Sequence, residues 1–106
     1  MTNNALKAMI GNDILSDTTN KPVVILHLDN GIKYIFNYNV NNSKGATRPK
    51  LSDLKFTTYG GEDAIEFERI DDNTNNKYTL KFLTDFVQGV TIIPNGSNID
   101  PNIVRW

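Results

Sequence analysis

The sequence predicts a mainly β protein: a single antiparallel meander sheet of about six strands, curled into a small barrel or sandwich, with one short N-terminal helix. Apolar and polar residues alternate along much of 23–93, as in strands that bury one face. Short turns rich in Gly, Asn and Asp separate these runs. No long helical pattern lies between them, which argues against a parallel sheet with crossover helices.

The 106-residue chain is expected to form one domain, 1–106. Its parts are a helix at 2–10, an antiparallel β meander at 23–93 and an irregular tail at 95–106. A chain of this length can bury a core without a covalent staple. It contains no cysteine, which excludes disulfides, thiolate metal sites and a cysteine nucleophile.

The N-terminal segment has the signals of a helix of about two turns. Thr2 or Asn3 can cap its first turn, and Gly11 can end it. Apolar side chains three and four residues apart share one face of this segment. Such a short helix needs support from the rest of the fold. The segment 16–21 is expected to be a loop.

The strongest local signal is the tripeptide Asp29-Asn30-Gly31 between two apolar strands at 23–28 and 32–40. It permits two hairpin registers. A two-residue Asn-Gly turn pairs position 29 with position 32. A three-residue loop with Gly31 in the left-handed region pairs position 28 with position 32. The two registers place opposite sets of side chains on the same face.

The three-residue loop is preferred because it gathers the apolar residues of both strands on one face. These are Val24, Leu26, Leu28, Ile32, Tyr34, Phe36 and Tyr38. The opposite face still holds three aliphatic residues, Val23, Ile25 and Ile35. The hairpin is therefore expected in the middle of the sheet, with part of its back covered.

Further strands are expected at 54–59, 63–70, 77–83 and 90–93. Gly60-Gly61 forms a turn after the first of them, and the polar segment 71–76 forms a turn after the second. The acidic side chains of Glu66 and Glu68 should then face Lys77 and Lys81. This arrangement gives the sheet one face of opposed charges in water.

The charge balance does not favour nucleic acid as a partner. Lys and Arg number 11 and Asp and Glu number 12, for a net charge of −1, whereas nucleic-acid binders carry a basic excess or face. No run resembles a secretion signal or a membrane helix. The expected location is the cytoplasm, or a phage particle, with no membrane partner.

The residues that could support catalysis form no recognisable site. His27 is the only histidine, and the chain has no GxSxG nucleophile motif. A single strand histidine is more typical of a surface or hydrogen-bonded residue than of a base. Glu66 and Glu68 share a face two residues apart, but lysines opposite them do not raise a carboxyl pKa as acid catalysis requires. The protein is expected not to be an enzyme and to have no cofactor.

The segment Asp71–Asn75 matches the first part of a calcium-binding loop and then departs from it. Asn76 replaces the glycine of the sharp turn, and Phe82 stands where the bidentate glutamate belongs. The segment is therefore interpreted as a hairpin turn, and no metal site is expected.

Two segments are candidates for contact with a partner. The stretch 37–50 is long for a loop in a compact domain. It carries Lys44, Arg48 and Lys50, so it is either a solvated connector or a contact with an acidic partner. The tail holds Ile99, Ile103, Val104, Arg105 and Trp106. Either it docks on the sheet or it contacts another chain, and Arg and Trp are frequent interface hot spots.

The function expected from these features is a non-enzymatic protein-binding module that occupies a partner's surface. The contact residues expected are Lys44, Arg48, Lys50, Tyr59, Arg105 and Trp106, with Tyr59 on the turn 59–62. The asparagine-rich composition is associated with AT-rich genomes, where an accessory or inhibitor protein of a phage or mobile element is one source of such chains.

Three alternatives remain at this stage. The chain can be a virion or assembly subunit that self-associates as a homo-oligomer through a strand edge or its tail. It can be a single-stranded nucleic-acid binder that stacks bases on Tyr34, Phe36 and Tyr38, although such an aromatic stripe usually belongs to a core. It can also hold a small molecule inside a barrel, for which the sequence names no ligand.

Overall fold

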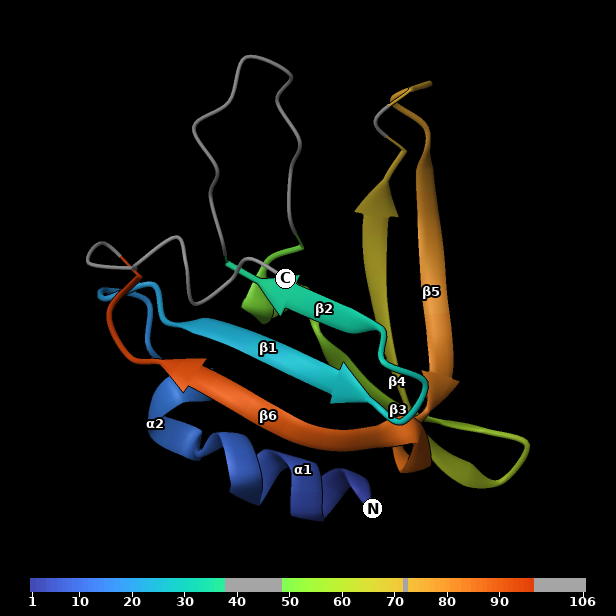
Figure 1. Cartoon of the computed structure of the whole chain (residues 1–106), viewed down its shortest axis with the longest axis horizontal. Coiled ribbons are helices and arrows are strands. Elements are labelled where there is room, and N and C mark those ends of the chain that lie inside the picture. Colours follow the sequence, from blue (N-terminus) through green and yellow to red (C-terminus); the bar gives the residue numbers. More distant parts are fainter. Residues whose placement is uncertain (38–48, 72, 97–106) are drawn as a thin grey trace.

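The computed structural model describes residues 1–37, 49–71 and 73–96. In this part the chain is mainly β, with six strands in two three-stranded antiparallel sheets and a short N-terminal helix. The first sheet has the strand order β2-β1-β6 and the second has the order β3-β4-β5. The strands of the two sheets run steeply across one another, and α1 lies below the first sheet (Figure 1).

The elements follow one another in a simple order along the chain. They are α1 (Asn3–Ile10), α2 (Asn12–Leu15), β1 (Val23–Leu28), β2 (Lys33–Phe36), η1 (Leu51–Asp53), β3 (Lys55–Tyr59), β4 (Glu62–Ile70), β5 (Lys77–Leu83), η2 (Thr84–Phe86) and β6 (Val87–Ile93), where η marks a 3₁₀ helix. No helix among the described residues has the length and hydrophobicity needed to cross a membrane.

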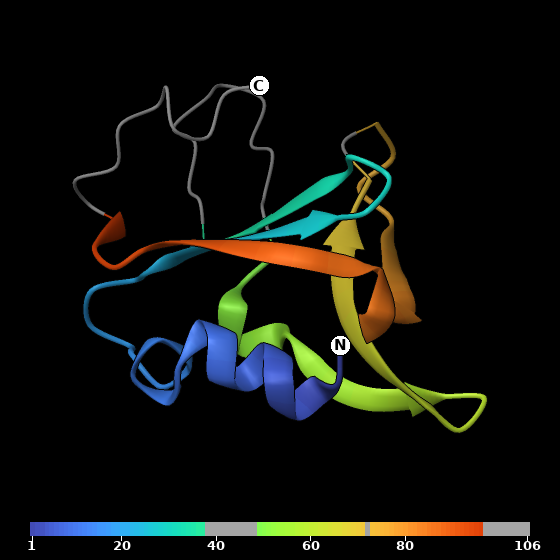
Figure 2. The ribbon, with the colours of Figure 1, turned by 60° about the horizontal axis from the view of Figure 1, so that its bottom comes forward.

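The expectation of a single six-stranded meander sheet over 23–93, curled into a small barrel or sandwich, is confirmed only in part. The described strands are antiparallel, but they form two separate sheets rather than one meander or a closed barrel. Only β3, β4 and β5 form a meander, and β6 returns to the first sheet to pair with β1. The pairing places Val90 opposite Leu26 and Ile92 opposite Val24. Apolar residues of β6 therefore gain apolar partners on β1. The tight η2 turn between β5 and β6 redirects the chain from one sheet to the other (Figure 2).

The N-terminal helix forms as predicted. The Oγ1 atom of Thr2 accepts a hydrogen bond from the Ala5 N–H at 3.0 Å, and Gly11 ends the helix with φ at 95°. Leu6 and Ile10 are buried from this helix. The four-residue α2 that follows was not predicted, because it has neither a side-chain cap nor a buried residue to mark it in the sequence.

The β1–β2 hairpin has the three-residue register that apolar segregation favours. Leu26 pairs with Tyr34, and the Leu28 N–H donates to the Ile32 carbonyl at 2.9 Å. Gly31 has a φ of 86°, in the left-handed region that the loop requires.

Asn37 ends β2 earlier than the predicted boundary at residue 40. Its φ is 67°, so it turns the chain out of the strand. Its side chain donates to the Pro22 carbonyl at 2.9 Å and accepts from the Leu51 N–H at 2.9 Å. Asn37 thus ties the start of β1 and the start of η1 to the end of β2. Residues 38–40 lie outside the described part of the chain.

The two sheets share one hydrophobic core with α1. It contains Leu6, Ile10, Val24, Leu26, Leu28, Phe36, Leu51, Leu54, Ile65, Phe67 and Val87. Aromatic rings join the sheets across it: the Phe67 ring packs edge-on against Phe36 and Tyr34, with centroids 4.9 and 5.3 Å apart. Tyr34 also stacks on Phe82. The aromatic stripe of β2 therefore belongs to the core.

The back of the first sheet is also buried in part, as expected. Val23, Ile25 and Ile35 form a second small cluster there, with Ile93 packed against it.

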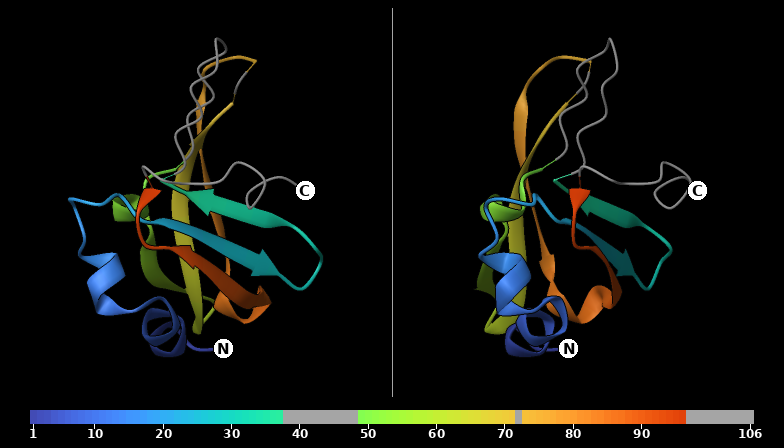
Figure 3. Two further views of the ribbon diagram at one scale, coloured as in Figure 1. Left: turned by 60° about the vertical axis from the view of Figure 1, so that its left-hand side comes forward. Right: turned by 90° about the vertical axis from the view of Figure 1, so that its left-hand side faces the viewer.

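The β4–β5 hairpin of the second sheet extends past the first sheet (Figures 1 and 3). Its inner face loses cover toward that end, and Tyr78 is 43% exposed.

Candidate functional site

The β3–β4 hairpin presents Tyr59, the one expected contact residue whose surroundings are described in detail. Gly60 and Gly61 form its two-residue turn, with φ of 59° and 83°. Positive φ at both positions is the requirement of a type I′ turn, whose twist matches that of the strands. The turn pairs Tyr59 with Glu62. The tight turn fixes where the Tyr59 side chain leaves the strand.

Tyr59 is 62% exposed, yet its ring has a contact within the protein. The Nζ atom of Lys81, on β5, lies 5.6 Å from the ring centroid. This is a distance at which an ammonium group is attracted to the face of an aromatic ring. A contact of this kind restricts the orientations of the ring while leaving a large part of it open to a partner.

Tyr59 belongs to the outer face of the second sheet, defined as the side chains of that sheet that point away from the core. Strand pairing places these side chains in register: Lys55 opposite Glu66, Tyr59 opposite Glu62, and Lys81 opposite Glu66 from the other side. The exposed members are Lys55, Tyr59, Glu62, Glu68, Lys77, Thr79 and Lys81. Ala64, the smallest side chain on this face, is buried.

The charges of the outer face form three stripes. The central strand β4 carries Glu62, Glu66 and Glu68, and lysines stand on the flanking strands at 55, 77 and 81. The predicted face of opposed charges is therefore present, with Glu66 directly opposite Lys81, while Glu68 faces Thr79. Equal numbers of lysine and glutamate leave this face without a basic excess.

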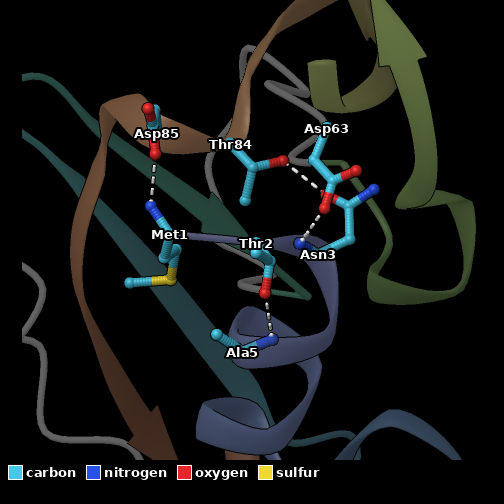
Figure 4. Close-up of polar contacts among 7 residues, drawn as sticks. All are labelled: Met1, Thr2, Asn3, Ala5, Asp63, Thr84 and Asp85. Carbon is cyan, nitrogen blue, oxygen red and sulfur yellow. Dashed lines mark hydrogen bonds and ion pairs between the residues drawn. The ribbon is translucent and has the colours of Figure 1, made fainter. Parts of the chain in front are cut away.

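A polar network at the N-terminus of α1 holds the base of this hairpin (Figure 4). The Asn3 backbone N–H donates to Asp63 Oδ2 at 2.7 Å, and its side-chain Nδ2 donates to the Thr57 carbonyl at 2.9 Å. The hydroxyl of Thr84, which is fully buried, donates to Asn3 Oδ1 at 2.5 Å. The Met1 ammonium group lies 2.5 Å from Asp85 Oδ1.

These contacts use both the donor and the acceptor of the Asn3 amide side chain. They connect α1 to η2 and to β3 and β4, the strands on either side of the Tyr59 turn. The network therefore has a structural role, since its polar groups are directed at one another. Its consequence for the site is a fixed base for the hairpin that carries Tyr59.

His27 meets a hydroxyl group but its described contacts do not form a catalytic triad. Its Nε2 lies 2.7 Å from Thr91 Oγ1 on β6. Burial lowers the pKa of His27, and the positive charge of Lys33, its cross-strand neighbour, lowers the pKa further. A neutral imidazole beside a hydroxyl supplies two of the three groups of a triad, which also needs a carboxylate to orient the base.

The calcium-like segment forms a turn, as interpreted from the sequence. Asp71 Oδ1 accepts the Asn73 N–H at 2.8 Å, and the Asp71 carbonyl accepts the Asn75 N–H at 2.8 Å. Asn75 has a φ of 58°. Within the described ranges, no group of three or more His, Asp or Glu side chains is placed to hold a metal ion.

The other expected contact residues are not brought to Tyr59 by any described contact. Lys50 is exposed and directly precedes η1, whereas Tyr59 ends β3. The remaining four, Lys44, Arg48, Arg105 and Trp106, lie outside the described residues. Sequence reasoning missed the contact of Lys81 with Tyr59. The signal present in the sequence is the alternation that places Lys81 on the polar face of its strand, but no expected register placed Tyr59 beside it.

The two aromatic residues of the proposed base-stacking surface that the structure describes are committed to the core. Phe36 is fully buried, and Tyr34 packs between Phe67 and Phe82. Tyr38 lies outside the described residues.

Comparison of the chain with models of protein families, with curated proteins and with solved structures finds no match in any of the three.

Proposed function

We propose that this chain is a non-enzymatic protein-binding module, and that the outer face of the second sheet, centred on Tyr59, is its contact surface. The observation that carries the proposal is that Tyr59 is 62% exposed but is held by a two-glycine turn and by the contact of its ring with the Lys81 ammonium group. Tyrosine is one of the residues most often found at interface hot spots. A restrained ring loses less entropy when a partner covers it.

The charge pattern supports a protein partner over a nucleic acid. Lysines on β3 and β5 flank glutamates on β4, so a phosphate backbone that approached the lysines would also approach carboxylates. A folded protein can match such stripes with charges of both signs. Its surface would place an apolar group on the Tyr59 ring and carboxylates beside Lys55 and Lys81.

The mode of action that follows is occupation of a partner's surface, as in an accessory or inhibitor protein. Affinity would come from the aromatic anchor, and the surrounding charges would set orientation and partner choice. Because the anchor is Tyr59, the combined reversal of Lys44, Arg48 and Lys50 to Glu is expected to change affinity by less than about tenfold.

Photocrosslinking in the native host tests the surface directly. A benzophenone side chain at position 59 should give a discrete adduct, because the anchor contacts the partner. The matched control is position 58, which is exposed on the same strand but points to the opposite face. Equal adducts from positions 58 and 59, or none from position 59, would contradict the proposal.

A further inference from the structure

Strand β5 has an open edge. It lies at the end of its sheet and pairs on one side with β4. In the described part of the chain no strand lies beside its other side, which faces outward in Figure 1. Backbone groups alternate between the two sides of a strand, so every second residue of β5 directs its N–H and C=O groups to this open side.

The apolar face of the sheet is incompletely covered at the same edge. On the central strand, Ile65 and Phe67 are buried. Their neighbours on β5, Phe82 and Leu80, are only half-buried, and Tyr78 is 43% exposed. The open edge is therefore bordered by apolar side chains that would lose further contact with water if another strand joined it.

We propose that two copies of this chain associate through their β5 strands, antiparallel, about a twofold axis at Leu80. Leu80 is the midpoint of the seven-residue strand, so this register pairs every residue of both strands. Leu80 meets the partner's Leu80, and Tyr78 meets the partner's Phe82 on the apolar side. Thr79 meets the partner's Lys81 on the outer side.

The positions of the lysines exclude the two neighbouring registers. Centring on Thr79 would set Lys77 opposite the partner's Lys81, and centring on Lys81 would set that residue opposite itself. Like charges directly opposite each other destabilise a strand pair. With Leu80 at the axis, Lys77 lies opposite the partner's Leu83, and no lysine lies opposite a lysine. Glu66, across β4, offsets the charge of Lys81.

The dimer would join the two second sheets into one six-stranded sheet with the order β3-β4-β5-β5-β4-β3. Directly paired residues share a face, so both outer faces would lie on the same side. The inference does not depend on the proposed function, because Tyr59 is on β3 and does not enter the β5 pairing. A chain that stays monomeric leaves the Tyr59 proposal standing, and partner binding that does not depend on Tyr59 leaves the β5 pairing standing.

Sedimentation of the full chain at micromolar to millimolar concentrations measures the dimer constant. Thr79→Lys places two like-charge pairs across the axis and should weaken association about three- to tenfold. Thr79→Glu places two opposite-charge pairs there and should strengthen it. Thr79 is exposed and faces Glu68 in its own chain, so Thr79→Lys does not oppose folding. Thr58→Lys, on the opposite edge of the sheet, is the matched control.

The register is tested by a single cysteine in this cysteine-free chain. Across the axis the two Leu80→Cys Cα atoms would lie about 4.5–5.5 Å apart, within the range of a disulfide. The two Tyr78→Cys atoms would lie four residues apart along the strand, out of reach. Oxidation should therefore give a covalent dimer with Leu80→Cys and much less with Tyr78→Cys. A monomer at all concentrations overturns the inference. So does association equally affected by Thr58→Lys, or equal crosslinking at both positions.

Discussion

The Nε2 atom of His27 lies 2.7 Å from the Oγ1 atom of Thr91, on the face of the first sheet that points away from the shared core. Burial and then Lys33 lower the pKa of this imidazole. Folding therefore favours the neutral form. The unfolded chain binds the proton more readily, so stability rises with pH between the lowered pKa of the folded protein and the ordinary value of about 6.5.

We predict that acidification through this window destabilises the protein and that His27→Gln removes this part of the pH dependence. Denaturation at a series of pH values measures the free energy of unfolding. NMR titration of the single histidine of the chain gives its pKa directly. A folded-state pKa at or above about 6.5 would show that the environment of His27 is described wrongly.

Replacing Asn3 should lower the free energy of unfolding more than replacing an exposed asparagine of the same helix. Asn3→Ala removes the donor to the Thr57 carbonyl and leaves the fully buried Thr84 hydroxyl without its described acceptor. The expected loss is about 1–3 kcal/mol of unfolding free energy. Asn4→Ala, at an exposed position of the same helix, is the control and should be neutral or slightly stabilising. Urea denaturation of both variants measures the difference, and equal stability would contradict the network.

Gly96 should not tolerate a side chain. A Cβ atom added there would lie 2.3 Å from the Lys21 carbonyl oxygen, whereas one added at Gly89 meets nothing within 4 Å. Gly96→Ala should therefore cost about 1–3 kcal/mol, as over-packing does, and lower the melting temperature. Gly89→Ala should change it little. If the two variants have the same melting temperature, the contact between residues 21 and 96 is not present in solution.

Local turn chemistry made most of the second sheet predictable. Gly60-Gly61 supplies positive φ at two successive positions, and the chain can meet that requirement with few residue types. Turn chemistry also located the β1–β2 turn at Asp29-Asn30-Gly31, but it permitted two registers, and the segregation of apolar residues on one face selected the three-residue loop. These signals are short-range, so they appear in the sequence next to the strands that they join.

The return of β6 to β1 was not predictable in the same way. The η2 segment, Thr84–Phe86, contains no glycine, proline or asparagine to mark a change of sheet. The pairing depends on contacts far apart in sequence, such as Val90 with Leu26. The contact of His27 with Thr91 follows from that pairing and was missed for the same reason. The position of Tyr59 at a turn was predictable because the turn is local, whereas its contact with Lys81 depends on the pairing of three strands.

The most direct test of the protein-binding proposal is the affinity of the purified chain for the partner crosslinked at position 59. Tyr59→Ala should weaken binding at least about tenfold, as loss of a hot-spot side chain does. Thr58→Ala, on the opposite face of the same strand, should not weaken it. Binding unchanged by Tyr59→Ala, or weakened equally by both variants, would contradict the assignment of the outer face as the contact surface.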